Sequence, residues 1–335
     1  MEMTDKKKGN AFTNNPLVRA IGLQKIVVLL VLLLMIIFFA SVSSTFRQYS
    51  TILSIFDATY YLAFLAMGVT FCLITGGVDL SIGTGMFCYA LAGGFLITHK
   101  DMPVIVGILV TLACGLIMGT INGLIVSRGG HAPFLATLCT MMIVRGLGAI
   151  ITGGASITWP SHTSPNGWTR LLFKFPIERT MYPLGIVWVL LVAVLLSIFL
   201  NKTRPGRYII AIGSNKEATR LSGINVANYQ MLAYIISGLC TGLAALAYSS
   251  AYQSMAPSGG GGIELNAIGG AIIGGTSMSG GSGTVAGTII GVCFMSVLQT
   301  GLPLIGLQAN YQQIIIGIVL IVAVYIDVLK NKKLA

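Results

Sequence analysis

Ser214 and Glu217 lie three residues apart in a basic, polar stretch, residues 204–224, of an otherwise apolar chain. At this spacing the serine hydroxyl can accept a hydrogen bond from the glutamate amide, while the glutamate carboxylate bonds back to the serine amide. Gly223 follows, and a glycine there can end a helix in the left-handed conformation. The pattern predicts a short capped helix over residues 215–222. Such a helix suits contact with a cytosolic partner; the alternative is an ordered loop that only connects two spans.

Asp79 is a carboxylate within an apolar segment, where a charge is costly and usually has a functional role. The alternative is that it caps a helix beginning near Leu80, because a carboxylate there satisfies free amides and favours the positive helix end. Asp57 and Glu264 lie at the starts of two other expected spans, 54–74 and 264–275, and admit the same explanation. Asp327, beside the final basic tail, is expected to be a surface charge.

Glycines interrupt the apolar pattern twice, at residues 74–83 and 273–281, and both segments contain Gly-Gly-x-x-[Leu/Met]-Ser-x-Gly. Irregular backbone at membrane depth is tolerated only where it is buried in protein or lines water. A match between two such segments suggests an internal repeat, which is common in transporters with broken helices. The candidates for lining a translocation path are therefore Gly76, Gly77, Asp79, Ser81, Phe71, Glu264, Gly274, Gly275 and Ser279.

Aromatic residues surround the first of these breaks, namely Tyr60, Tyr61, Phe64, Phe71, Phe87 and Tyr89. Aromatic faces suit sugar rings, so these side chains could line a pathway. Packing within a helix bundle is the more common role of such residues, and the sequence leaves both interpretations open.

The composition sets the fold class. Of the 335 residues, 55% are hydrophobic and only 9% are charged, whereas about a quarter of the residues in a soluble domain are charged. Continuous rather than alternating apolar runs argue against a β-barrel. The chain is predicted to be an all-α polytopic membrane protein with about ten transmembrane helices in one domain, residues 26–329. The expected spans are 26–42, 54–74, 82–98, 104–126, 133–152, 183–200, 229–251, 264–275, 285–302 and 311–329.

The basic residues predict the orientation. With the N-terminus inside and ten alternating spans, the inside holds 14 of them: Lys6, Lys7, Lys8, Arg19, Lys25, Arg128, Lys202, Arg204, Arg207, Lys216, Arg220, Lys330, Lys332 and Lys333. The outside holds five: Arg47, Lys100, Arg170, Lys174 and Arg179. Arg145 falls within a span. The positive-inside rule then places both tails, 1–25 and 330–335, and the loop at about 201–228 in the cytoplasm. A retained first span is favoured over a cleavable signal peptide.

Other function classes find little support in the residues. The net charge of +11 follows from the positive-inside rule, so no nucleic-acid partner is expected. The cysteines lie in apolar segments without metal-ligand spacing, and the three histidines are scattered, so neither a metal site nor a disulfide framework is predicted. No Gly-Lys dipeptide occurs, which excludes a P-loop. The loop from about 153 to 182 is too short for a domain but could form an external cap with Trp159 and Trp168.

Seven motifs together resemble the permease subunits of ribose/galactose-type (carbohydrate) ABC importers. They lie at residues 76–81 (Gly-Gly-Val-Asp-Leu-Ser), 133–138, 206–208, 211–215, 217–224, 264–265 and 274–277. The resemblance runs from about residue 45 to 330. It implies a dimer with a second permease copy or paralogue, a cytosolic ATPase and an external or periplasmic sugar-binding protein, in a bacterial inner membrane. It also implies a coupling helix that docks into the ATPase, with the contact residues Ser214, Glu217, Ala218, Arg220, Leu221 and Gly223.

Two departures from the family pattern are Asn266, where an acid is common, and the added flexibility expected at Gly269 and Gly270. The resemblance implies that this chain binds no cofactor and is not an enzyme, and that the partner subunit uses the ATP. The principal alternative is a stand-alone, ion-coupled secondary transporter, which would be expected to carry more paired acids within the membrane. A membrane-embedded enzyme would need a catalytic set that the sequence does not present.

Overall fold

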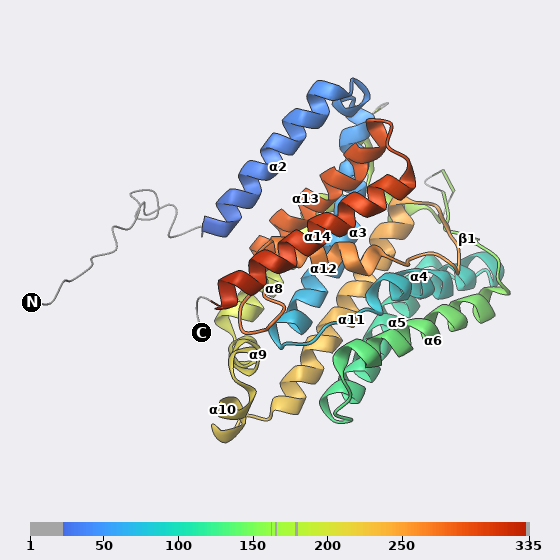
Figure 1. The fold of residues 1–335 in the computed structure, drawn as a ribbon. Helices are drawn as coiled ribbons and strands as arrows, with labels where there is room; N and C mark the ends of the chain where they lie inside the picture. The colour runs from blue at the N-terminus through green and yellow to red at the C-terminus, as the bar shows by residue number, and fades with distance from the viewer. Residues whose placement is uncertain (1–22, 162, 165, 178–179, 333–335) are drawn as a thin grey trace, which may run out of the picture.

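The computed structural model describes residues 23–161, 163–164, 166–177 and 180–332. Helices dominate it (Figure 1). The long helices are α2 (Leu23–Val42), α3 (Tyr49–Ile74), α4 (Ile82–His99), α5 (Val104–Ser127), α6 (Pro133–Thr152), α8 (Gly185–Lys202), α11 (Val226–Ala251), α13 (Val285–Leu304) and α14 (Ala309–Lys332). The shorter elements are η1 (Thr45–Arg47), β1 (Ile157–Thr158), α7 (Trp168–Leu171), β2 (Phe175–Ile177), β3 (Thr180–Tyr182), α9 (Arg204–Ser214), α10 (Lys216–Leu221), β4 (Ser254–Met255) and α12 (Ile263–Ile273).

Among the described residues, nine helices are long and apolar enough to cross a membrane, which confirms the predicted all-α polytopic class. The tenth expected span is α12, which has 11 residues and is therefore about 16 Å long, roughly half a hydrocarbon core. Gly269 and Gly270 lie within it. They are buried in continuous helix against Leu320 of α14 and Val292 of α13, so neither glycine breaks the helix.

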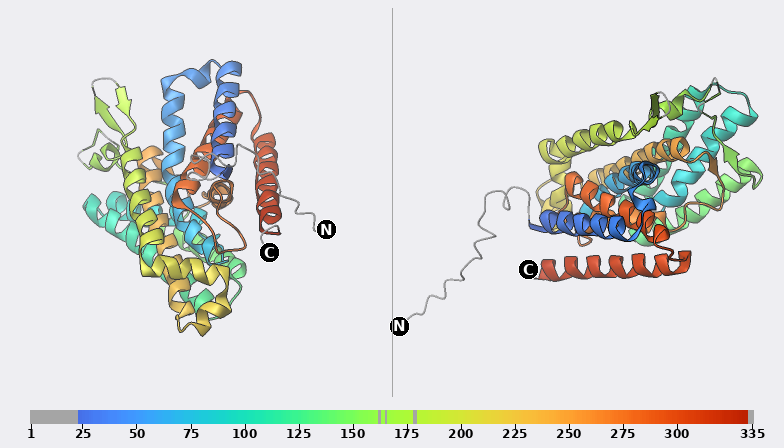
Figure 2. Two further views of the ribbon diagram at one scale, coloured as in Figure 1. Left: turned by 90° about the vertical axis from the view of Figure 1, so that its left-hand side faces the viewer. Right: turned by 90° about the horizontal axis from the view of Figure 1, so that it is seen from above.

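The first residues of α2 and the last of α14 lie at the same end of the bundle, together with α9 and α10 (Figures 1 and 2). This arrangement agrees with an even number of crossings. The terminal residues 1–22 and 333–335, which carry much of the predicted cytoplasmic charge, lie outside the described residues.

The helices α3 and α11 form the centre of the bundle. α3 packs against α8, α11, α12 and α13, while α11 also packs against α4 and α5. Small residues let α5 and α11 approach closely: side-chain atoms added at Gly115 or Gly119 would overlap the α11 backbone around Gly238. Close helix contact through small residues is the usual packing solution within lipid.

The segment between α6 and α8 forms the predicted cap over one end of the bundle. β1 pairs antiparallel with β4, and the buried Trp159 donates from Nε1 to the carbonyl of Ala90 at 2.9 Å. Lys174 forms an ion pair of 2.6 Å with Asp57. The prediction that Asp57 starts a span was wrong, because it lies well inside α3 and ties the cap to that helix.

Thiol labelling tests the sidedness that the basic residues predict. In a cysteine-free background, Asn166→Cys should react with a membrane-impermeant maleimide from outside, whereas Lys216→Cys should react only after permeabilisation. Both positions are exposed, so access to the correct aqueous side is what decides the labelling. Labelling of Lys216→Cys in intact, unpermeabilised cells would contradict the predicted topology.

Candidate functional site

The first glycine break holds a buried network centred on Asp79, which is 1% exposed. Its Oδ1 accepts hydrogen bonds from the amide and the hydroxyl of Ser81, at 3.0 and 2.6 Å. Its Oδ2 accepts from the hydroxyl of Ser237 on α11 at 2.8 Å. Asn122 on α5 donates to the Ser81 hydroxyl at 2.8 Å. Asp79 therefore connects the break between α3 and α4 to two neighbouring helices.

This geometry modifies the capping interpretation. The residue at the N-cap of α4 is Ser81, and its side chain makes no capping hydrogen bond. Asp79 instead accepts from the Ser81 amide two residues ahead, as in an Asx turn. The carboxylate thus holds the unwound backbone in place rather than pointing into open space.

Asp79→Asn is expected to assemble and transport almost as well as the parent. Asparagine keeps one acceptor oxygen for Ser81, and its amide can donate to the Ser237 hydroxyl in place of Oδ2. Asp79→Leu is the matched control and should reduce the amount of folded protein, because each buried donor left unpaired costs about 1–3 kcal/mol. The yield of folded, purified permease measures assembly, and uptake by the importer reconstituted with its partners measures transport. Normal assembly of Asp79→Asn with no uptake would show that transport needs the negative charge.

The second break has its own buried carboxylate. Asp327 on α14 accepts from the Ser277 hydroxyl at 3.2 Å and from the Met278 amide at 3.1 Å. It is 6% exposed, so the prediction of a surface charge was wrong. Sequence distance hid this contact, because the acid lies 50 residues beyond the break that it holds.

Of the remaining candidates in the second break, Gly274 packs so closely that a Cβ there would overlap the carbonyl of Gly287 in α13. Gly275 has a left-handed φ of 100°, and Ser279 is exposed. Glycine is therefore required at 274 by the close approach and favoured at 275 by the backbone conformation.

The two breaks meet each other. The amide of Gly281 donates to the carbonyl of Ile74 at 2.9 Å, joining the second break to the first. Gly213, near the end of α9, lies against this bond: a Cβ there would overlap both the Ile74 oxygen and the Gly281 nitrogen. In the first break, Gly76 has a left-handed φ of 77°, and a Cβ on Gly77 would lie 2.5 Å from the hydroxyl of Tyr234. The matched glycine motifs therefore form one junction, and α9 touches both halves of it.

The helix predicted over residues 215–222 is present as α10, Lys216–Leu221, and Gly223 follows with a left-handed φ of 80°. The predicted capping box was wrong. Asn215 is the N-cap, and its Oδ1 accepts from the Ala218 amide at 2.9 Å. Ser214 ends α9 and donates to the carbonyl of Ile210.

The other predicted contact residues of α10 lie at its surface. Glu217 pairs with Arg220 at 3.0 Å instead of bonding back to residue 214. Ala218 is exposed, and Leu221 is 84% exposed. An apolar side chain this open, on a helix whose only buried residue is Thr219, is consistent with a surface that a partner covers.

Sequence reasoning missed α9, which occupies the first half of the loop. Its signals were nevertheless present. The Thr203 hydroxyl accepts from the Gly206 amide at 3.2 Å as an N-cap, and Pro205 lies in the first turn, where its missing amide costs nothing. The loop is therefore a pair of helices with α10 as its tip.

Phe71 and Glu264 occupy different kinds of environment. Phe71 is fully buried, with its ring 6.0 Å from that of Phe199 on α8, which favours packing over lining a path. Glu264 starts α12 and is 8% exposed. Its Oε1 accepts from the Gly262 amide at 3.0 Å. Among the described residues its Oε2 has no hydrogen-bond partner.

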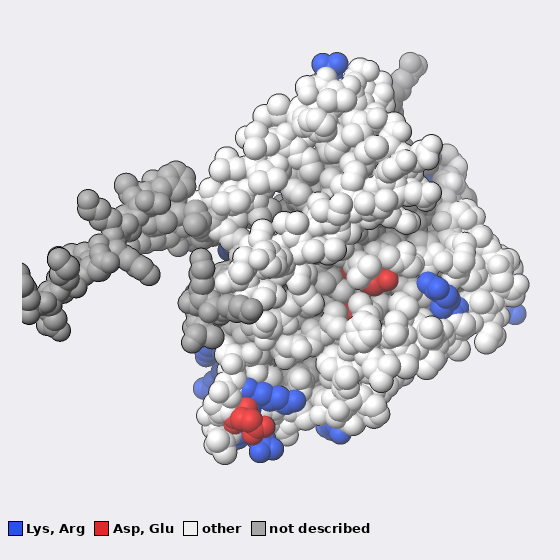
Figure 3. All heavy atoms as spheres, in the orientation of Figure 1, with Lys and Arg blue, Asp and Glu red and all other residues white. Residues whose placement is uncertain are grey.

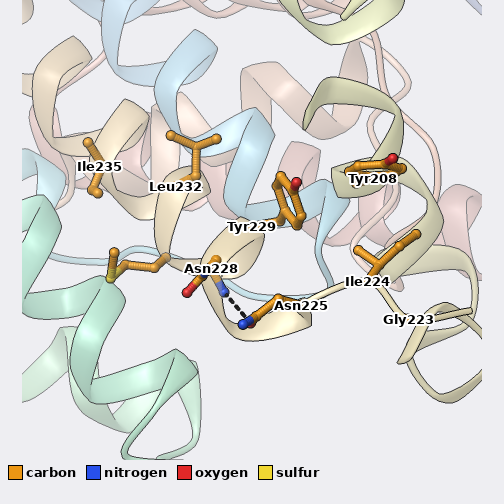
Figure 4. Close-up of a pocket in the computed structure, with 9 residues that line it drawn as sticks. Tyr208, Gly223, Ile224, Asn225, Asn228, Tyr229, Leu232 and Ile235 are labelled. Atoms are coloured by element: carbon orange, nitrogen blue, oxygen red, sulfur yellow. Dashed lines mark hydrogen bonds between the residues drawn. The ribbon is translucent and has the colours of Figure 1, made fainter. Parts of the chain in front are cut away.

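A groove of about 580 Å³ lies beside α9 and the start of α11 (Figure 4). The rings of Tyr208 and Tyr229 meet edge to face at 5.0 Å on one side. Asn225 caps α11 by accepting from the Asn228 amide at 3.2 Å, the bond that is dashed in the figure. The groove therefore lies between the α9–α10 pair and the first turns of α11.

The chain matches the family described as branched-chain amino acid transport system / permease component over residues 51–324. It is 35% identical over 302 residues to the ribose import permease protein RbsC of Escherichia coli (strain K12), covering 88% of this chain and 89% of that protein. It is 31% identical over 338 residues to the D-allose transport system permease protein AlsC of the same strain, covering 99% and 100%. The fructose import permease protein FruG of Bifidobacterium longum (strain NCC 2705) is 30% identical over 287 residues, 84% of each chain. No solved structure matches it.

Proposed function

Because the chain belongs to the family of branched-chain amino acid transport system permease components, we propose that it forms the membrane path of an ATP-driven sugar importer. Relatives named for ribose, D-allose and fructose transport confirm the predicted resemblance to permeases of carbohydrate importers. All three are transport permeases. A neutral sugar or a sugar-like solute is therefore the substrate class that fits the chain best.

One observation carries the mechanism: the exposed helix α10 connects directly to the junction of the two broken helices. α9 ends at Ser214 and α10 begins at Lys216, so a force on α10 acts on α9 within one residue. Gly213 of α9 contacts the hydrogen bond that joins the breaks. Backbone packed this tightly cannot absorb a displacement gradually, so movement of α10 passes to both breaks.

The proposal requires partners. A separate cytosolic ATPase binds α10 and hydrolyses ATP, an external binding protein delivers the sugar, and a second permease copy or a paralogue completes the path. The residues that contact the ATPase are Ala218 and Leu221, with Glu217 and Arg220 at the edge. This chain binds no cofactor itself. It resides in the cytoplasmic membrane of a bacterium with both termini in the cytoplasm.

Copurification tests this assignment. The tagged permease, extracted in mild detergent from its native host, should retain an ATPase with a P-loop and a second permease chain. An external binding protein should stimulate ATP hydrolysis by the purified complex. A permease that purifies alone under several mild detergents and yet transports sugar would contradict the assignment.

A further inference from the structure

Arg145 is a charge within a membrane span. It lies inside α6, which is apolar and long enough to cross the membrane, and its side chain is exposed. Its position, seven residues before Thr152, places it about 10 Å from the end of the helix nearest the cap. Within the described part of the chain it has no hydrogen-bond or ion-pair partner. Charges at this depth nearly always face a bundle interior or a water-filled cavity, because lipid cannot solvate them.

Glu264 supplies the opposite charge from the first turn of α12. Nine-tenths of the residue is buried, yet its Oε2 has no hydrogen-bond partner among the described residues. A buried carboxylate oxygen without a donor is costly. It therefore retains an unused acceptor position, which is closed to solvent in this conformation and which a ligand can fill only when the path opens.

The two charges converge on one short loop, residues 259–262. A Cβ on Gly261 would lie 3.1 Å from Nη2 of Arg145, and Gly261 precedes Glu264 by three residues. On the other side, a Cβ on Gly83 in α4 would overlap Oε2 of Glu264. No ion pair within 4 Å joins Arg145 to Glu264 in the described chain. Figure 3 shows acidic atoms in a hollow near the middle of this face, with a basic side chain near them in this view.

The same loop borders aromatic rings. A Cβ on Gly259 would overlap the ring of Phe87, and that ring lies 4.7 Å from the ring of Tyr248. Tyr248 in turn lies 4.7 Å from Tyr252, which is 38% exposed. A hydrogen-bond donor, an acceptor and aromatic surface thus gather around one segment at membrane depth.

We propose that Arg145 and Glu264 form a binding site for a neutral polyhydroxylated solute within the translocation path. The guanidinium donates to hydroxyl or ring oxygens, and Oε2 of Glu264 accepts from a hydroxyl. A hydroxyl group can act in both ways, so one polyol satisfies both groups. Arg145 and Glu264 carry opposite charges, so the pair favours neither a net anion nor a net cation. This inference rests on the proposed function and identifies two residues that contact the substrate.

Uptake by the complete importer in proteoliposomes tests the site, with D-ribose, D-allose and D-fructose as probes. Arg145→Gln and Glu264→Gln should each lower uptake at limiting sugar about tenfold or more, because each removes a charge-assisted hydrogen bond. Copurification of the partners and ATP hydrolysis stimulated by the binding protein should stay normal. Arg128→Gln, which removes a basic side chain at the far end of α5, is the control and should transport like the parent.

Thiol labelling supplies a second readout that does not depend on transport. In a Cys139→Ser background, Arg145→Cys should react with a charged, water-soluble thiol reagent. Ile143→Cys should not, because Ile143 lies on the other side of the buried Val144. The sugar that is transported should slow the labelling of Arg145→Cys.

Three outcomes would overturn the site. The first is parental uptake by Arg145→Gln and Glu264→Gln. The second is recovery of uptake in the swapped variant, Arg145→Glu with Glu264→Arg, which would show that the two residues form an ion pair with each other instead of a solute site. The third is equal labelling at residues 143 and 145. If the parent importer transports neither these sugars nor any other neutral sugar or polyol in a wider panel, the proposed function itself fails. If the parent transports a sugar and every variant transports it equally well, only the proposed site fails.

Discussion

Leu221→Asp should abolish uptake and copurification of the ATPase while leaving the amount of permease in the membrane unchanged. Leu221 is 84% exposed at the tip of the α9–α10 helix pair, so the fold itself does not need its apolar side chain. In a complex that buries it, the leucine contributes about 1.5–3 kcal/mol. An aspartate there also places an unpaired charge in the contact. We therefore expect at least a hundredfold loss of ATPase binding, measured by copurification from membranes.

Leu221→Met is the matched control, because it changes the shape of the side chain but keeps its apolar character and about its volume. It should copurify and transport nearly as the parent does. Parental behaviour of Leu221→Asp would mean that α10 is only a connector between two spans, and the ATPase would then have to bind elsewhere.

Gly213→Ala should reduce uptake more than tenfold although the ATPase still copurifies. The added methyl group would overlap the carbonyl of Ile74 and the amide of Gly281, the two atoms that join the breaks. Overpacking of this kind typically costs about 1–3 kcal/mol and shifts the backbone. The surface of α10 is unchanged in this variant. We therefore expect the ATPase to bind normally while the movement of the two breaks is impaired.

Gly317→Ala on α14 is the control, because nothing lies within 4 Å of a Cβ at that position. Alanine in a helix is more favourable than glycine by about 1 kcal/mol. An effect of helix propensity alone would therefore stabilise both variants. ATP hydrolysis and sugar uptake are measured on the same proteoliposomes. Equal uptake by Gly213→Ala and the parent would show that coupling does not pass through this contact.

The sequence was sufficient for the span pattern, because long apolar runs carry a strong signal at membrane length. It overestimated α12, whose apolar composition extends into Gly274 and Gly275 although the helix ends at Ile273. Hydropathy measures composition, and it does not detect the glycine conformation that unwinds the backbone there.

The candidate site was predicted in parts. The glycine breaks and α10 followed from local patterns, but their contact depends on Gly213, Ile74 and Gly281, which are far apart in the chain. The choice between Ser214 and Asn215 as the cap of α10 could not be made locally, because both are good N-caps and α9 extends through Ser214. The burial of Asp327 likewise depends on tertiary packing alone.

The most direct measurement is sugar uptake into proteoliposomes that hold the purified permease with its copurifying ATPase and binding protein. The account predicts that accumulation requires both ATP on the cytoplasmic face and the binding protein on the other, and that it persists when sodium and proton gradients are collapsed. Accumulation by the permease alone, without ATP and driven by an imposed ion gradient, would contradict it and establish the chain as a secondary transporter.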